Sequence, residues 1–96
     1  MSSQTYGVPL SLEQVYPLLL KLEEQGVITR TFRRLDPPRQ QAVIDAILAE
    51  AAVSGPAEIN IKHVATRSGV AVGSLYQYFG NREGLINFAI ELVTYQ

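Results

Sequence analysis

Tyr76, Gln77 and Tyr78 stand side by side inside the stretch GVAVGSLYQYFGNREGL, residues 69–85. A glutamine amide offers a hydrogen-bond donor and an acceptor together, a pair that matches the edge of an adenine base. Tyrosine hydroxyls can donate hydrogen bonds to phosphate oxygens, which position a duplex without reading its sequence. The chemistry that these three side chains offer is therefore recognition by hydrogen bonding rather than catalysis.

The sequence lacks the residue patterns of common catalytic and metal sites. It contains no cysteine, which excludes a disulfide framework, a thiol nucleophile and a cysteine-ligated metal. Ser74 lies in VGSLY, which lacks the second glycine of a nucleophile elbow, and the glycine spacings of phosphate and dinucleotide loops are absent. His63 is the single histidine and is expected to be exposed rather than a ligand or a base. We therefore expect no enzymatic activity, no metal and no cofactor.

The composition indicates one small domain with a hydrophobic core. The 96 residues are 47% hydrophobic and carry a formal net charge of -1, which weakly disfavours a nucleic-acid binder. Four arginines, however, occur within ten residues, opposed only by Asp36. A solvated linker is one interpretation of this group. The other is an N-terminal arm, formed by Arg33, Arg34 and Arg39, that contacts phosphate or enters a minor groove.

Neither a membrane span nor a secretion signal is visible in the sequence. No apolar run approaches the roughly 20 residues that cross a bilayer. The first residues, MSSQTYG, lack the basic start and the apolar stretch of a signal peptide. We therefore expect a cytoplasmic protein that does not contact a membrane.

The central polar residues are predicted to lie on a short helix, residues 72–79. Leu75 and Phe79 are four residues apart, so they share one face and can anchor this helix to a core. Upstream, Asn60 is expected to cap a second short helix that ends at Gly69. Two short helices joined by a tight glycine turn form the helix-turn-helix pattern.

Longer helices are predicted on both sides of this motif. One begins at Asp36 and Pro37 and ends at Gly55. Asn81 is expected to cap a last helix, whose apolar stripe requires a partner in the same chain or in another. The apolar face of the first consists of Val43, Ile44, Ile47, Leu48, Ala51 and Ala52, and that of the second of Leu85, Ile86, Ala89, Leu92 and Val93.

The N-terminal third is predicted to contain one amphipathic helix, from Ser11 to about Gln25. Pro17 lies inside it, so a kink or a restart near Tyr16 is expected. The stretch QVYPLLLKLEEQGVI resembles the recognition helix of PadR-type winged-helix regulators, and TRTFRRL would then be the remnant of a wing. GVITRTF is the single β-like alternation in the chain. An extra helix that packs on the domain, on another subunit or on a further domain is the simpler interpretation.

Many positions with matching spacing carry a second resemblance, to the DNA-binding domain of TetR-type transcriptional regulators, over residues 40–90. The matching positions are Val64-Ala65, Gly69-Val70, Gly73-Ser74, Leu75-Tyr76, Gln77, Tyr78-Phe79, Arg82-Glu83 and Leu85. The fold expected is all-α. Residues 36–96 form a three-helix, homeodomain-like helix-turn-helix domain with the start of a fourth, connecting helix, and residues 1–35 form an N-terminal helical extension.

The resemblance also implies which side chains contact DNA. Asn60 and Arg82 match positions that contact phosphate, and Thr66 and Arg67 match positions at the edge of the groove. The helix at 72–79 would lie in the major groove. The complete predicted contact set is Asn60, Thr66, Arg67, Val72, Gly73, Ser74, Tyr76, Gln77, Tyr78 and Arg82.

Four positions depart from the family pattern. Ala71 replaces the usual serine cap of the recognition helix, which removes about 1 kcal/mol of capping. Val72 stands where a polar or basic residue is common, and it can contact a thymine methyl group. Gly80 replaces a frequent proline, and Gly84 weakens the first turn of the last helix. These departures concern the specificity-determining contacts more than the fold.

The function that the resemblance implies is sequence-specific DNA binding by a bacterial transcriptional regulator, most often a repressor. It also implies a homodimer on a palindromic operator of double-stranded DNA. A small-molecule effector is expected only if a larger C-terminal helical domain lies outside these 96 residues. The alternative is a helical protein-interaction or dimerisation module whose helix-turn-helix does not bind DNA, and the near-neutral charge favours that alternative.

Overall fold

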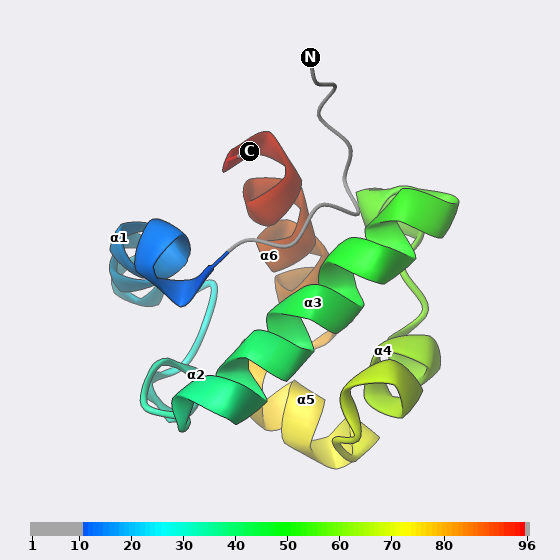
Figure 1. Cartoon of the computed structure of the whole chain (residues 1–96), viewed down its shortest axis with the longest axis horizontal. Helices are drawn as coiled ribbons and strands as arrows, with labels where there is room; N and C mark the ends of the chain where they lie inside the picture. The colour runs from blue at the N-terminus through cyan, green and yellow to red at the C-terminus, as the bar shows by residue number, and fades with distance from the viewer. Residues whose placement is uncertain (1–10, 96) are drawn as a thin grey trace.

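The computed structural model of the protein describes residues 11–95, so the expectation for MSSQTYG lies outside the described residues. All regular structure in the described part is helical, which confirms the predicted all-α class. The elements are α1 (Leu12–Glu24), α2 (Arg30–Arg33), α3 (Pro37–Ser54), the 3-10 turn η1 (Pro56–Glu58), α4 (Ile61–Ser68), α5 (Val72–Phe79) and α6 (Arg82–Tyr95). In Figure 1, α3 crosses the front of the molecule, with α1 and α2 on one side and α4 on the other.

Helix α1 begins and ends where the sequence predicts. Ser11 and Gln14 form a capping box, in which each side chain accepts a hydrogen bond from the other residue's backbone N–H. Gly26, with φ 80°, ends the helix. The predicted restart near Tyr16 is wrong, because α1 continues through Pro17. Pro17 is exposed, so water can satisfy the carbonyl that loses its hydrogen-bond partner.

The segment after α1 is a short helix rather than a wing, so the wing interpretation of TRTFRRL is wrong. Thr29 has extended backbone angles and its hydroxyl accepts from the N–H of Phe32, which starts α2. Ile28 and Phe32 are four residues apart and both buried. The β-like alternation therefore reflects two apolar side chains that share one side of a turn and a helix.

Helix α3 is the long central helix. The Asp36 carboxylate accepts from the N–H of Arg39, Pro37 occupies the first turn, and Gly55, with φ 87°, ends the helix. Five of the six predicted core residues are buried, but Ala52 is exposed. Its inclusion in the apolar face is wrong, because one further step of about 100° turns its side chain from the core toward solvent.

One hydrophobic core includes residues of α1 and α2 together with those of the helix-turn-helix. Three phenylalanines meet at its centre: the ring centroid of Phe32 lies 5.1 Å from that of Phe79 and 5.5 Å from that of Phe88. Helix α6 finds the partner that its apolar stripe requires in α3, α5 and η1, and the hydroxyl of Tyr95 also joins it to α1 by donating to the carbonyl of Gln14 at 2.7 Å. Within residues 11–95, no helix has the length and hydrophobicity to cross a membrane.

Candidate nucleic-acid interface

Helices α4 and α5 form the predicted helix-turn-helix. Gly69 ends α4 in the left-handed conformation, at φ 74° and ψ 20°, which an L residue adopts only with strain. Val64 on α4 and Leu75 on α5 are fully buried, so both helices are anchored from the same side. The bounds of α5, Val72–Phe79, agree with the prediction. The face of α5 opposite Leu75 is therefore exposed to solvent.

The solvent face of α5 carries Gly73, Tyr76 and Gln77. Tyr76 is 39% exposed, and Gly73 and Gln77 are also exposed. Val72 and Ser74 are half-buried. Ala71 makes no side-chain capping bond, as its residue type predicts. The face therefore combines an amide, a phenol and a bare backbone segment, and no residue of α5 is charged.

Tyr78 differs from its prediction, because the structure buries it. Only 5% of the residue is exposed, and its ring centroid lies 5.5 Å from that of Phe32. Tyr78 is therefore a core residue, whereas the prediction placed it among the side chains that contact DNA. Helix α2, which the sequence did not reveal, covers this side of α5 and converts an expected surface position into core. A phosphate contact by its hydroxyl has no support in this arrangement.

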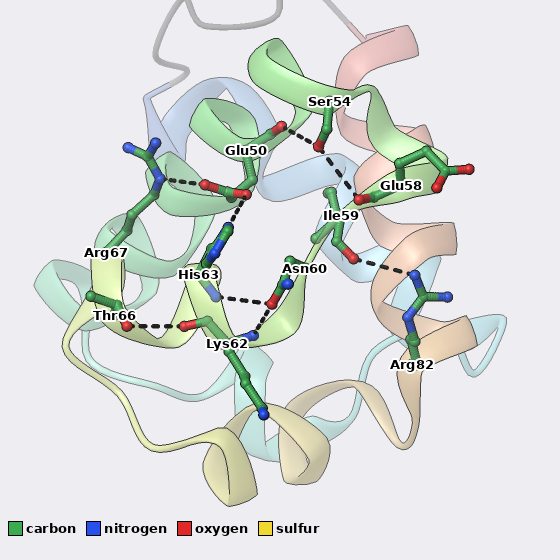
Figure 2. A network of polar contacts seen from close by, with 10 residues as sticks. All are labelled: Glu50, Ser54, Glu58, Ile59, Asn60, Lys62, His63, Thr66, Arg67 and Arg82. Atoms are coloured by element: carbon green, nitrogen blue, oxygen red, sulfur yellow. Dashed lines mark hydrogen bonds and ion pairs between the residues drawn. The ribbon is translucent and has the colours of Figure 1, made fainter.

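Asn60 starts α4 with its side chain. Its Oδ1 accepts from the N–H groups of Lys62 and His63 at 2.8 and 3.3 Å (Figure 2). The hydroxyl of Thr66 donates to the Lys62 carbonyl at 3.0 Å. The exposed side chain of Lys62 points away from this network and has no ion-pair partner in the described part of the chain. Lys62 is thus a cation at the start of α4 that the sequence analysis did not select.

Glu50 of α3 holds two basic residues of α4 (Figure 2). Its carboxylate accepts from the Nε of Arg67 at 2.6 Å and lies 3.2 Å from the Nδ1 of His63. The Glu50 side chain is only 5% exposed, whereas that of His63 is 63% exposed, as predicted. Arg67 is therefore an ion-paired side chain and not a free cation. The signal that sequence reasoning missed was a carboxylate inside the apolar stripe of α3, directly before Ala51.

Arg82 and Asn81 place the start of α6 beside α4. An Nη of Arg82 donates to the carbonyl of Ile59 at 3.4 Å, and Asn81 caps α6 by accepting from the N–H of Gly84 at 2.8 Å. A Cβ on Gly84 would lie 2.0 Å from the carbonyl oxygen of Phe79. Gly84 thus permits a close approach of α5 and α6. The sequence predicted only that this glycine weakens the first turn of α6. Gly80, with φ 84°, occupies a backbone conformation closed to the proline frequent in the family.

The arginine group at residues 30–39 is not an extended arm, because it lies on α2, at the C-cap of α2 and on the first turn of α3. Arg33 forms an ion pair with Glu23 and is half-buried. Arg39 lies 3.9 Å from the carboxylate of Asp36. Arg34 is exposed and has no ion-pair partner among the described residues. The predicted basic group is therefore divided between paired and unpaired side chains.

A family model described as "Bacterial regulatory proteins, tetR family" matches residues 43–88. The match runs from α3, through both helices of the helix-turn-helix, into α6. No curated protein and no solved structure matches the chain. The matched segment contains the helix-turn-helix that α4 and α5 form. Regulators of this family bind DNA through this motif. Over residues 43–88 the chain therefore matches the N-terminal DNA-binding domain of the TetR family of bacterial regulatory proteins.

Proposed function

We propose that this protein is a transcriptional repressor that binds a specific operator with α5 in the major groove. The observation that carries the proposal is the solvent face of α5, where Gly73, Tyr76 and Gln77 are exposed on a helix-turn-helix of the TetR family. A major groove about 12 Å wide admits one helix, and an exposed glycine lets the backbone approach the duplex closely. The proposal also places the protein in the cytoplasm.

The exposed side chains divide by the part of DNA that they suit. Gln77 pairs with an adenine edge, and Val72 and Ser74, half-buried at the start of α5, reach the nearest bases. Tyr76 and the polar groups around α4 and the start of α6 contact phosphates, which sets the register of α5. The proposed phosphate contacts are Asn60, Tyr76 and Arg82, and Thr66 and Arg67 lie at the edge of the groove.

The proposal includes a homodimer. Two copies of α5 would then lie in successive major grooves, about 34 Å apart, and read the two halves of a palindrome. An effector molecule would act through a further domain outside these 96 residues.

Selection of bound sequences from a random duplex pool tests the proposal. We expect the wild-type chain to enrich a palindrome and Gln77→Ala to lose base preference at one position in each half-site. Gln25→Ala, which removes an exposed glutamine beyond the end of α1, is the matched control and should enrich the wild-type palindrome. Absence of any enriched sequence, together with no binding to DNA at low salt, would favour the protein-interaction alternative.

A further inference from the structure

The end of the recognition helix is bound directly to the start of α2. The N–H of Thr29 donates to the carbonyl of Tyr78 at 2.9 Å, and the Thr29 hydroxyl donates to the carbonyl of Gln77 at 2.8 Å. The same hydroxyl accepts from the N–H of Phe32 and so caps α2. One threonine thus joins the last turn of α5 to the first turn of α2. Gln77, the base-reading residue of the proposed function, is therefore hydrogen-bonded through its backbone carbonyl to the N-cap residue of α2.

The other end of α2 is fixed to α3. The Nε2 of Gln40, a buried side chain, donates to the carbonyls of Phe32 and Arg33 at 2.9 and 3.2 Å. Phe32 itself is fully buried in the core. Helix α2 is therefore held at its start, its middle and its end, and its backbone packs beside α5 (Figure 1).

Two exposed arginines, Arg30 and Arg34, lie at the two ends of α2. The Arg30 side chain is 73% exposed, and its one carboxylate neighbour, Glu23 at 4.0 Å, already forms the ion pair with Arg33. Arg34 is exposed and without an ion-pair partner in the described segment. Arg30 begins α2 and Arg34 directly follows its last residue, so the two arginines are about one helical turn apart in the chain.

The helix-turn-helix itself is poor in free positive charge. Helix α5 has no charged residue, and Arg67 is neutralised by Glu50. Lys62 and Arg82 are the cations that remain on α4 and the start of α6. A DNA-binding surface needs cations near phosphates for most of its affinity. The arginines of α2, next to the end of α5, are placed to supply them.

We propose that α2 is a second DNA contact, in which Arg30 and Arg34 bind phosphates beside the bases that α5 faces. This inference rests on the proposed function. It extends the interface beyond the family domain, which begins at residue 43. Thr29 keeps the two contacts in register, because it joins α2 to the backbone of Gln77.

The salt dependence of binding to a labelled mixed-sequence duplex tests this contact. Each lost phosphate contact lowers the slope of log K against log salt by about 0.9. The double variant Arg30→Gln, Arg34→Gln should therefore lower the slope by about 1.8, and Arg30→Lys, Arg34→Lys should retain it. Lys21→Gln is the matched control, because Lys21 is an exposed cation that lines a groove with Glu91 and Tyr95, at the far end of α6.

The outcomes separate the two proposals. A double glutamine variant with the slope of Lys21→Gln, in a protein whose wild type binds DNA with a steep salt dependence, would overturn the α2 contact and leave the proposed function intact. A wild-type chain that does not bind the duplex at low salt would overturn both.

Discussion

Gly73 on α5 and Gly84 on α6 are two helical glycines with different surroundings. A Cβ on Gly73 would have no heavy atom within 4 Å, whereas a Cβ on Gly84 would meet the Phe79 carbonyl oxygen at 2.0 Å. Neither glycine has a positive φ. The protein itself therefore requires a glycine at position 84, and only a close ligand can require one at position 73.

Gly73→Ala is expected to separate stability from DNA binding. The free energy of unfolding should rise by about 0.5–1 kcal/mol, because alanine forms helix better than glycine and meets no neighbour here. Affinity for the selected operator should nevertheless fall, because the new methyl group lies between α5 and the duplex. Urea denaturation and a binding titration measure the two effects. A variant that gains stability and keeps its affinity would show that DNA does not approach this part of α5.

Gly84→Ala is expected to destabilise the fold. The added methyl group would overlap a backbone oxygen at the α5–α6 junction, and overpacking of this kind costs about 1–3 kcal/mol. Urea denaturation of Gly84→Ala beside Gly73→Ala is a matched comparison, since the same atoms are added at two helical positions. Equal stability of the two variants would contradict the close approach of Gly84 to Phe79.

At the scale of elements, local sequence signals predict where the helices end, but they do not predict which other helices pack over them. The bounds of α5 follow from Leu75, Phe79 and the flanking glycines, all within a dozen residues. The burial of Tyr78 depends instead on Phe32, which arrives from α2. The polar contacts of Thr29 and Glu50 likewise join residues of different helices. Periodicity and capping residues carry no information about such contacts, so the sequence predicts the motif better than its surroundings.

Glu50 on α3 and Arg67 on α4 are expected to be energetically coupled, because they form an ion pair between the two helices. Glu50→Gln should lower the free energy of unfolding by roughly 1–3 kcal/mol, because a buried charge-assisted hydrogen bond is lost. Arg67→Gln leaves the buried carboxylate with His63 alone and should also destabilise. The double variant should lose less than the sum of the two, in a cycle measured by urea denaturation. If the two losses of unfolding free energy were strictly additive, the ion pair would contribute nothing to the stability of the contact between α3 and α4.

At the scale of the whole molecule, α1 and α2 belong to the same core as the helix-turn-helix. Phe32 contacts the rings of Tyr78, Phe79 and Phe88, which lie on α5 and α6. The family pattern gives no sign of this arrangement, because its match begins after α2. The N-terminal helices therefore cover a side of α5 that the motif alone leaves uncovered.

Phe32→Ala is expected to destabilise the whole molecule and not α2 alone. Truncation of a fully buried phenylalanine costs about 3–5 kcal/mol, a large part of the 5–15 kcal/mol typical of a small domain. Circular dichroism should show a single cooperative transition at a lower temperature. Two separate transitions, with the helix-turn-helix melting as in the wild type, would contradict a shared core.

The hydrogen bond from Tyr95 to the carbonyl of Gln14 joins residues 81 positions apart in the chain. During synthesis the N-terminal residues leave the ribosome first, at about 5–20 residues per second. Helix α1 therefore emerges several seconds before α6, with which it forms this hydrogen bond. Contacts of such long sequence separation close late. These helices thus complete their packing only after α6 has been translated, and α5, which packs against α6, gains that contact only then.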